Sequence, residues 1–407
     1  MTRRFPDRFL WGCATAAHQV EGASTNNDWW RFEEQGGILT GETSLVANDE
    51  WHRYKEDLDL LAGLHNNAHR LSVEWSKVEP EPGRFDAAAI EHYRDVLQEL
   101  RRHEMTPMVT LLHFTSPLWF VDAGGWAAPG AAARWLPFVQ RVAEDLGDLV
   151  GLWCTLNEPN IMAFMGWVAG EFPPGRHYDL LGFYRVLRNL RRAHDAAYRL
   201  LHRVTPSIPA GLAHNRWLLL PERLIMADRL AAGFAAGVMD RWPSGLWRWD
   251  PVVEATSDFI GLNHYTGQLV RFDPTHAEQV FTRRRNPAGL EESAFGWALN
   301  PRWMGQALRD LAPLGKPVYV TESGISTHDD RARAAYLPRL LAEVWEAIQD
   351  GVDVRGYFHW TGIDNFEWAH GYSQPFGLIA FDPETGARTV KPSGEVFARI
   401  AEANALP

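Results

Sequence analysis

Two glutamates end strand-like apolar runs in distant parts of this chain. Glu158 closes the run at 151–159, GLWCTLNEP, and Glu322 closes the run at 317–324, PVYVTESG. Two carboxyl groups held about 5 Å apart could cleave a glycosidic bond, one protonating the leaving oxygen while the other attacks the sugar carbon. Each glutamate could instead belong to an unrelated buried ion pair. The chemistry therefore depends on whether the fold brings the two side chains together.

Short apolar runs alternate with longer helix-periodic stretches along the whole chain. The helical stretches are 87–102, 131–146, 180–204 and 331–349, where apolar residues recur at spacings of three and four. The runs predicted to be strands are 9–15, 68–74, 106–114, 149–157, 208–214, 258–265, 317–322 and 354–360. Such alternation is typical of βα units that close a parallel sheet. We therefore predict an α/β fold with one domain over residues 1–407, a single (β/α)8 TIM barrel with long loops.

In such a barrel the carboxyl ends of the strands converge on one face, which is where catalysis takes place. Polar and aromatic residues follow the predicted strands at these ends, namely His18-Gln19, Glu74-Trp75, His113-Phe114, Asn157-Glu158, His214-Asn215, Asn263-His264-Tyr265, Glu322 and residues 360–368. A sugar site would use the polar groups for hydroxyls and the aromatic faces for C–H surfaces. The chain has 19 tryptophans, and any single one is more often a packing residue than a ligand.

Several longer motifs resemble those of one enzyme family over essentially the whole chain. They are FLWGCATAAHQVEG at 9–22, WHRYKED at 51–57, WCTLNEP at 153–159, DFIGLN at 258–263, DNFEW at 364–368, Gly371-Tyr372 and FGL at 376–378. Asn-Glu-Pro alone is shared by several related glycosidase families, but its combination with the first and last motifs is specific. The chain resembles glycoside hydrolase family 1, the β-glucosidase family.

The resemblance implies a retaining double displacement in which Glu158 is the general acid/base and Glu322 the nucleophile. A general acid must keep its proton near neutral pH, and a nucleophile must stay ionised. Arg70 and Tyr265 match positions that supply hydrogen-bond donors to the nucleophile, and Asn263 is a further supporting residue. Arg70 could instead close a surface ion pair, but its place in the apolar run 68–73 favours a buried position.

The resemblance also implies a set of substrate-binding residues. They are Gln19, His113, Asn157, Trp297, Trp360, Glu367, Trp368 and Phe376. Phosphoglycosidases of the family usually carry a small hydroxyl residue at the position of Glu367, where a carboxylate would repel the substrate phosphate. Glu158 argues against the myrosinase-like branch, which has glutamine there. Trp297 matches the tryptophan that contacts the aglycone, with a core role as the alternative.

We therefore expect an exo-acting β-glycosidase that hydrolyses unphosphorylated β-D-glucosides, and also β-galactosides and β-fucosides. The chain departs from the family pattern at Phe114, Ser323, His264, residues 361–363 and Pro375. These departures remove no bond-making group, but they leave the preferred sugar and aglycone open.

The altered positions near Phe114 and Pro375 suggest transglycosylation by the same glutamates as an alternative. A sugar-binding pseudoenzyme is disfavoured because both glutamates are present. The resemblance further implies a cis peptide bond after Trp360.

Composition and charge restrict the partners. The formal net charge of −11 disfavours nucleic acid, which binds clustered positive charge. The basic run Arg283–Arg285 is predicted to be a solvated loop. His65 and His69 lack the glutamate of a zinc-protease motif, so we expect no metal and no cofactor. The expected partner is a small β-glycoside or oligosaccharide, and the oligomeric state stays open.

The remaining expectations concern the compartment. Cys13 and Cys154 lie in apolar segments, where an unpaired thiol behaves as a small hydrophobe, so no disulfide framework is predicted. The first ten residues contain charges and no apolar signal region. No stretch approaches the roughly 18 to 20 apolar residues of a membrane-spanning helix. We therefore expect a cytoplasmic protein without a membrane partner.

Overall fold

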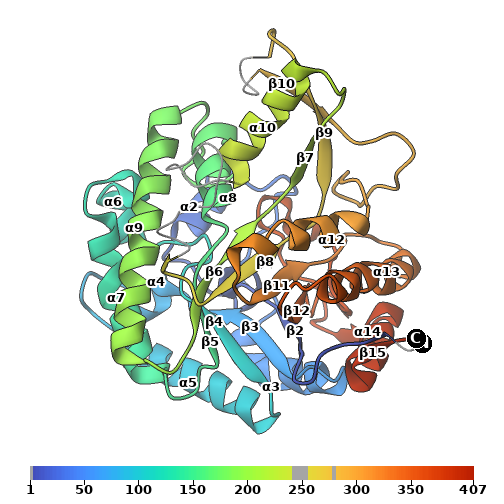
Figure 1. The fold of residues 1–407 in the computed structure, drawn as a ribbon. Helices are drawn as coiled ribbons and strands as arrows, with labels where there is room; N and C mark the ends of the chain where they lie inside the picture. Colours follow the sequence, from blue (N-terminus) through green and yellow to red (C-terminus); the bar gives the residue numbers. More distant parts are fainter. Residues whose placement is uncertain (1–2, 241–254, 277–280) are drawn as a thin grey trace.

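The computed structural model describes residues 3–240, 255–276 and 281–407, and its centre is a closed parallel barrel (Figure 1). The strands follow the order β11-β12-β2-β3-β4-β5-β6-β8 around the barrel. Their bounds are Leu10–Ala14 (β2), Ala68–Ser72 (β3), Thr106–Thr110 (β4), Leu152–Asn157 (β5), Ala210–Asn215 (β6), Phe259–Asn263 (β8), Val318–Ser323 (β11) and Val354–Trp360 (β12). The predicted fold is confirmed, and each predicted strand contains or overlaps one of these strands.

Long helices surround the barrel (Figure 1). They are Glu50–Gly63 (α3), Ala87–Arg102 (α5), Ala131–Leu146 (α7), Leu180–Val204 (α9), Arg302–Arg309 (α12), Asp330–Gln349 (α13) and Pro392–Ala403 (α14). In α5 the Asp86 side chain accepts hydrogen bonds from the first free amides, and the apolar ridge that includes Tyr93 and Leu97 is buried. Capping thus fixes where α5 begins, and burial of one face holds it against the barrel.

Further helices lie in the loops after the strands. They are Ala17–Val20 (α1), Asp28–Glu34 (α2), Trp75–Val78 (α4), Leu118–Asp122 (α6), Pro159–Phe164 (α8) and Met226–Asp240 (α10). Four of the predicted strands end earlier than expected, at Ala14, Ser72, Thr110 and Asn263. After Ser72 the chain turns out of the barrel, because the carboxylate of Glu74 accepts a hydrogen bond from the Ser76 amide and begins α4.

A three-stranded sheet stands outside the barrel. Its strands are Leu218–Pro221 (β7), Gly267–Phe272 (β9) and Thr282–Arg285 (β10), with β9 in the middle. The prediction that the basic run Arg283–Arg285 forms a loop is therefore wrong. Backbone hydrogen bonds with β9 satisfy the amide and carbonyl groups of this segment. The side chains of Arg283 and Arg285 still reach solvent. A charged run can form an edge strand when its side chains remain hydrated.

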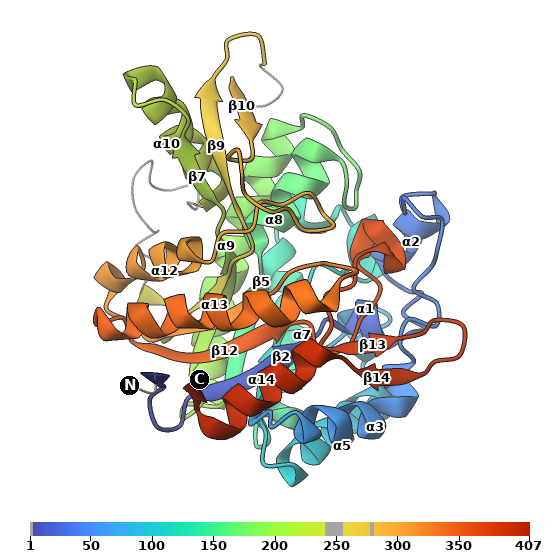
Figure 2. The same cartoon turned by 90° about the vertical axis from the view of Figure 1, so that its right-hand side faces the viewer.

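Two small sheets complete the fold, and one of them joins the two ends of the chain (Figure 2). Arg3–Arg4 (β1) pairs with Ala405–Leu406 (β15), and Ile379–Phe381 (β13) pairs with Arg388–Val390 (β14). Both cysteines are buried and free, as predicted. The peptide bond between Trp360 and Thr361 is cis, in agreement with the family resemblance. Across the described ranges, none of the helices combines the length and apolar character needed to span a bilayer.

Candidate active site

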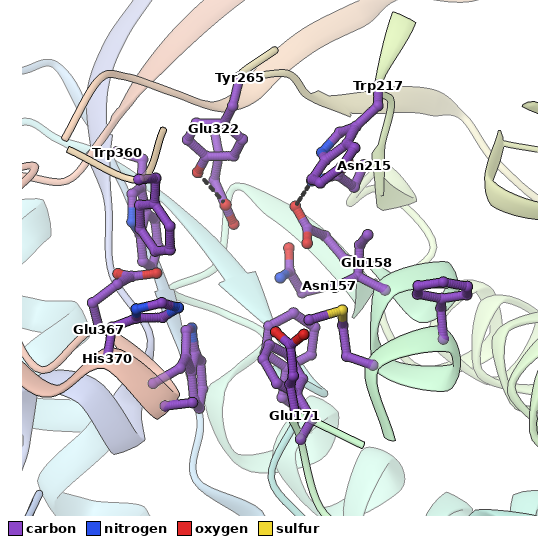
Figure 3. Close-up of a pocket in the computed structure, with 18 of the residues that line it drawn as sticks. Asn157, Glu158, Glu171, Asn215, Trp217, Tyr265, Glu322, Trp360, Glu367 and His370 are labelled. Atoms are coloured by element: carbon purple, nitrogen blue, oxygen red, sulfur yellow. Dashed lines mark hydrogen bonds between the residues drawn. The ribbon is translucent and has the colours of Figure 1, made fainter. Parts of the chain in front are cut away.

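A pocket of about 350 Å³ opens at the carboxyl ends of the barrel strands (Figure 3). Predicted site residues supply much of its lining, namely His113, Asn157, Glu158, Tyr265, Trp297, Glu322, Trp360, Glu367, Trp368 and Phe376. The other three predicted residues, Gln19, Arg70 and Asn263, lie behind this lining and hydrogen-bond to it. The barrel therefore brings together side chains that are hundreds of residues apart.

Glu322, at the end of β11, has one hydrogen-bond donor on each carboxylate oxygen. Arg70 Nη1 lies 2.5 Å from Oε1, and the Tyr265 hydroxyl donates to Oε2 at 2.8 Å. Burial raises the pKa of Glu322, while the charge of Arg70 and the bond from Tyr265 lower it. Because a cation faces Glu322 and an anion faces Glu158, Glu322 is the one that ionises first.

Glu158 follows β5 and begins α8 with a left-handed backbone, at φ 43°. Its Oε1 atom accepts two amide hydrogen bonds, from Asn263 Nδ2 at 2.7 Å and from Asn215 Nδ2 at 2.8 Å. An oxygen that accepts two N–H bonds is not the protonated one, so the proton of the acid form lies on Oε2. Burial, and then the negative charge of Glu322, raise the pKa of Glu158 to about 8.

A polar network connects the two glutamates to the pocket wall. Asn157 Oδ1 accepts hydrogen bonds from Arg70 Nη2 at 2.7 Å and from Asn263 Nδ2 at 3.1 Å. Its own amide nitrogen lies 2.9 Å from His113 Nε2 and donates to it. Burial and the nearby charge of Arg70 lower the pKa of His113 well below its usual value. His113 is therefore neutral, with its proton on Nδ1.

Three buried polar atoms of this site make no hydrogen bond with the described protein residues. They are His113 Nδ1, a donor, and Gln19 Oε1 and Asn215 Oδ1, both acceptors. Gln19 Nε2, in contrast, donates to the Phe366 carbonyl at 2.9 Å and to Glu367 Oε2 at 3.2 Å. Buried polar groups normally have partners. A donor and an acceptor left over in one pocket are suited to a hydroxyl-bearing ligand.

Glu367 and two tryptophans complete this part of the pocket. Figure 3 places Glu367 next to Trp360. Burial raises the pKa of Glu367 to about 8, against the effect of hydrogen bonds from Trp360 and Gln19. The Trp368 ring stacks on the ring of His113, with centroids 5.9 Å apart. This arrangement offers both hydrogen bonds and aromatic faces, as a sugar ring requires.

The rest of the lining is mostly apolar. Trp297 stacks on Phe295 with ring centroids 4.3 Å apart, and Trp217 meets Trp297 edge-on at 6.0 Å. Residues that the sequence did not single out as binding residues are Phe114, Ile161, Phe164, Met165, Glu171, Phe172, Asn215, Trp217, Arg284, Phe295, Ala369 and His370. Of these, Phe114 and Asn215 had a signal, because both stand at the ends of predicted strands. Most of the others come from short helices, β10 and loops, where the apolar ones look like core residues.

One cluster of three possible metal ligands lies in the described part of the chain. Asp59, Glu99 and His103 lie close enough to share an ion, but none of the three lines the pocket. Arg102 already pairs with both acidic groups. This cluster is a surface ion-pair group, and the absence of a cofactor stays a prediction.

The comparison with known families decides the identity of this barrel. The model of glycosyl hydrolase family 1 matches residues 1–245 and 250–406. The chain belongs to glycosyl hydrolase family 1. Beta-glucosidase A of Thermotoga maritima is 31% identical, with 99% of each chain covered. The bifunctional beta-D-glucosidase/beta-D-fucosidase of Bifidobacterium breve is 32% identical, with 98% of each covered.

Solved family 1 structures have the same fold. The beta-glycosidase from Pyrococcus horikoshii is 34% identical, with a TM-score of 0.91 over 100% of this chain and 97% of that one. The family 1 β-glucosidase from Thermotoga maritima is 30% identical, with a TM-score of 0.93 and coverage of 100% and 99%. That enzyme has been solved in complex with deoxynojirimycin. The chain is therefore a β-glucosidase-type glycoside hydrolase of a retaining family.

Proposed function

We propose that this family 1 enzyme is a retaining, exo-acting β-glycosidase with Glu322 as nucleophile and Glu158 as general acid/base. The observation that carries the proposal is the unequal environment of the two carboxyl groups. Glu322 has a guanidinium beside it and a donor on each oxygen, whereas Glu158 has two donors on one oxygen and its proton on the other. One group is arranged to be an anion and the other to give up a proton.

The first chemical step forms a bond from Glu322 to the anomeric carbon. As the bond from that carbon to the leaving oxygen breaks, the proton on Glu158 Oε2 moves to this oxygen. The products are an alcohol and a glycosyl ester of Glu322. Tyr265 and Arg70 hold the attacking carboxylate in place. The side chain of Glu322 therefore loses less conformational entropy on the way to the transition state.

The second step returns the enzyme to its starting state. Glu158, now a carboxylate, accepts a proton from water while the water oxygen attacks the anomeric carbon. The bond to Glu322 breaks, and its carboxylate recovers the hydrogen bonds from Tyr265 and Arg70. Two inversions at one carbon leave the product with the configuration of the substrate.

Several features support an unphosphorylated terminal sugar as the substrate. The unpartnered donor on His113 and acceptor on Gln19 suit hydroxyl groups. A sugar phosphate would meet the carboxyl group of Glu367 rather than a cation. The described lining contains no lysine, and its one arginine, Arg284, belongs to β10 outside the barrel. Buried Trp360 and Trp368 wall this part of the pocket, which supports removal of a single terminal residue.

We propose β-D-glucosides as the main substrates, with β-galactosides and β-fucosides as further ones. The Bifidobacterium breve relative, named as both a glucosidase and a fucosidase, supports the fucoside part of this proposal. Fucose lacks the hydroxyl at carbon six, so its turnover would depend on the contacts to the other ring hydroxyls. His113 and Gln19 are the residues that we assign to those contacts.

A panel of nitrophenyl β-glycosides tests the proposal, with proton NMR to follow the first-formed sugar. We expect hydrolysis of the glucoside, galactoside and fucoside, with the β-anomer appearing before mutarotation. A first-formed α-anomer would contradict retention. Preferential turnover of a phosphoglucoside would contradict the assignment of an unphosphorylated sugar, while leaving the roles of the two glutamates intact.

Transglycosylation with the same glutamate pair is the second candidate. The apolar half of the lining, which includes Trp217, Phe295 and Trp297, could hold an acceptor alcohol in the place of water. The product ratio in the presence of abundant acceptor distinguishes the two activities. If free sugar remains the dominant product under these conditions, the enzyme is a hydrolase and this second candidate fails.

A further inference from the structure

Helix α1 supports the part of the pocket wall that contains Glu367 and Trp368. Two consecutive residues of α1 contact these two consecutive residues of the wall. Gln19 Nε2 donates to Glu367 Oε2 at 3.2 Å. The His18 ring lies against the Trp368 ring, with centroids 6.0 Å apart and an angle of 9° between the planes. His18 is not among the lining residues, so it can affect a bound sugar only through the groups that it contacts.

Trp368 has a backbone conformation that a bulky residue rarely adopts. Its φ is 50°, in the left-handed region. Such a conformation costs free energy and persists only where the surrounding structure holds it. The Trp368 side chain is buried, and it contacts the rings of both His18 and His113. The position of Trp368 therefore depends on the rings packed around it.

Glu33 of α2 holds His18 from the side away from the barrel strands. His18 Nε2 lies 2.8 Å from Glu33 Oε1, and the two side chains are 0% and 1% exposed. Ser44 supplies two more donors to this carboxylate. Its hydroxyl donates to Oε1 at 2.7 Å, and its backbone N–H donates to Oε2 at 2.8 Å. An ionised carboxylate can stay buried when donors surround it in this way.

The hydrogen bonds of Asn27 determine the tautomer of His18. The backbone N–H of Trp30 donates to Asn27 Oδ1 at 2.8 Å, so this atom is the carbonyl oxygen of the amide. Asn27 Nδ2 lies 3.1 Å from His18 Nδ1 and must donate to it. The proton of the His18 ring is therefore on Nε2, where it points to Glu33. Both the orientation and the proton position of His18 are fixed by its neighbours.

The same chain of buried polar groups continues to the backbone beside His113. Asn27 Nδ2 also donates to Glu74 Oε1 at 3.4 Å, and the Thr115 hydroxyl donates to Glu74 Oε2 at 2.8 Å. The backbone N–H of Thr115 in turn donates to the His113 carbonyl at 3.0 Å. These groups thus support both rings of the stacked pair that Trp368 forms with His113.

We propose that His18, held in one orientation by Glu33, is a positioning residue for Trp368 in the sugar site. His18 itself touches no substrate. Its ring keeps the Trp368 ring where an aromatic face can contact the C–H surface of a sugar. The nature of this ligand rests on the proposed function, whereas the position of Trp368 is a property of the protein alone.

A purely structural role for the pair is the competing explanation. Breaking a buried pair by changing one partner destabilises a protein wherever the pair lies, so a loss of stability does not separate the two explanations. The dependence on Trp368 does. If His18 and Glu33 act through the Trp368 ring, their effect on catalysis should vanish once that ring is removed.

A double-mutant cycle between Glu33 and Trp368 tests the proposal. Glu33→Gln keeps the shape of the side chain but places an NH₂ group among the donors of His18 and Ser44. We expect kcat/KM for a nitrophenyl β-glucoside to fall at least about tenfold, because the sugar is held less well. Trp368→Ala should cost at least as much. The double variant should lose less than about twofold beyond Trp368→Ala. Losses that multiply in full would overturn the proposal.

Asp258→Asn is the matched control. Asp258 Oδ2 lies 2.9 Å from His202 Nε2, and Asp258 stands just before β8, at the end of the barrel opposite the pocket. This variant should keep kcat/KM within about threefold of the wild type. Urea unfolding shows which variants are folded. If Glu33→Gln does not fold, His18→Phe replaces it in the cycle, because phenylalanine keeps a ring but loses the hydrogen bonds that orient it. The same dependence on Trp368 is expected.

A crystal structure of Glu33→Gln provides a test that needs no turnover. The Trp368 ring should leave its parallel position against His18, so that the centroids no longer lie 6.0 Å apart. A Trp368 ring in its original place would overturn the proposal whatever the rates are. A wild-type protein that turns over no glycoside would count against the proposed function alone, and a displaced ring would then still support the positioning role.

Discussion

Arg70 and Glu322 form a buried ion pair, with Nη1 of the arginine 2.5 Å from Oε1 of the glutamate. The side chain of Arg70 is fully buried and that of Glu322 is 5% exposed. The two residues lie on β3 and β11, and closure of the barrel brings them together. The pair gives Glu322 a cation that Glu158 lacks, and this difference is the basis of the roles assigned to the two glutamates.

Removing this cation should destabilise the protein in a pH-dependent way. Arg70→Met leaves a buried carboxylate without its partner, so we expect a loss of about 3–5 kcal/mol in the free energy of unfolding near neutral pH. The substitution raises the folded-state pKa of Glu322 further above its unfolded-state value. At a pH between these two values the carboxyl group is ionised only in the unfolded state, which lowers the free energy of unfolding. The loss should therefore shrink at acid pH, where Glu322 is neutral in both states.

Urea unfolding of the two proteins at neutral and at acid pH measures this difference. Arg309→Met is the matched control, because Arg309 forms a largely exposed ion pair with Asp350. It should cost less than about 1 kcal/mol. Equal losses in the two variants would show that the buried pair does not have the energetic role described.

The pH dependence of catalysis should report on Glu158. A general acid works while it is protonated, so kcat/KM should fall as the pH rises through about 8, the pKa to which burial and Glu322 raise this group. Asn215→Leu removes an N–H donor that favours the ionised form, so the fall should move to higher pH.

Initial rates with a nitrophenyl glucoside across the pH range give this profile. Glu171→Gln, which changes another carboxylate of the pocket lining, should leave the alkaline limb in place. A limb that stays fixed in Asn215→Leu, or moves with Glu171→Gln, would assign the titration to a different group.

The two glutamates should respond differently to the leaving group. Glu158→Ala should lose about a hundred- to ten-thousandfold in rate on an alkyl glucoside, which needs a proton donor. On a dinitrophenyl glucoside the first step should persist, and azide should restore turnover by attacking the glycosyl-enzyme. Glu322→Ala should be inactive on both substrates. Losses of equal size for both substrates in both variants would contradict the assignment.

Glu367 should matter for the sugar and not for the bond that breaks. Glu367→Ala removes a group assigned to the sugar hydroxyls, where each hydrogen bond is worth about 0.5–1.5 kcal/mol, so kcat/KM for the glucoside should fall by about tenfold or more. Glu171→Ala should stay within about threefold of the wild type. Michaelis constants and rates for both variants provide the check. Similar losses in the two variants would place Glu367 outside the sugar site.

The barrel could be predicted because its strands are short apolar runs separated by amphipathic helices. The strand ends were less predictable. The stretch predicted to run through Glu74 stops at Ser72 because Glu74 caps the next helix instead of continuing the sheet. The sheet containing β10 was missed because Arg283–Arg285 has the composition of a loop, and its pairing with β9 depends on a partner that the local sequence does not reveal.

The polar half of the pocket was predictable from motifs, whereas the apolar half was not. Asn157 stands in the WCTLNEP motif and Tyr265 matches a position of the family resemblance, and both line the pocket. Phe164 and Met165 belong to a short helical stretch after β5, where a core residue and a pocket residue have the same sequence pattern.

The most direct test of the account is to trap the glycosyl-enzyme. A fluorinated β-glucoside with a good leaving group slows both steps but allows the first to accumulate, and mass spectrometry of the intact protein and its peptides locates the label. The account predicts one fluoroglucosyl group per chain, attached to Glu322. A label on Glu158, or turnover with inversion and no covalent adduct, would contradict it.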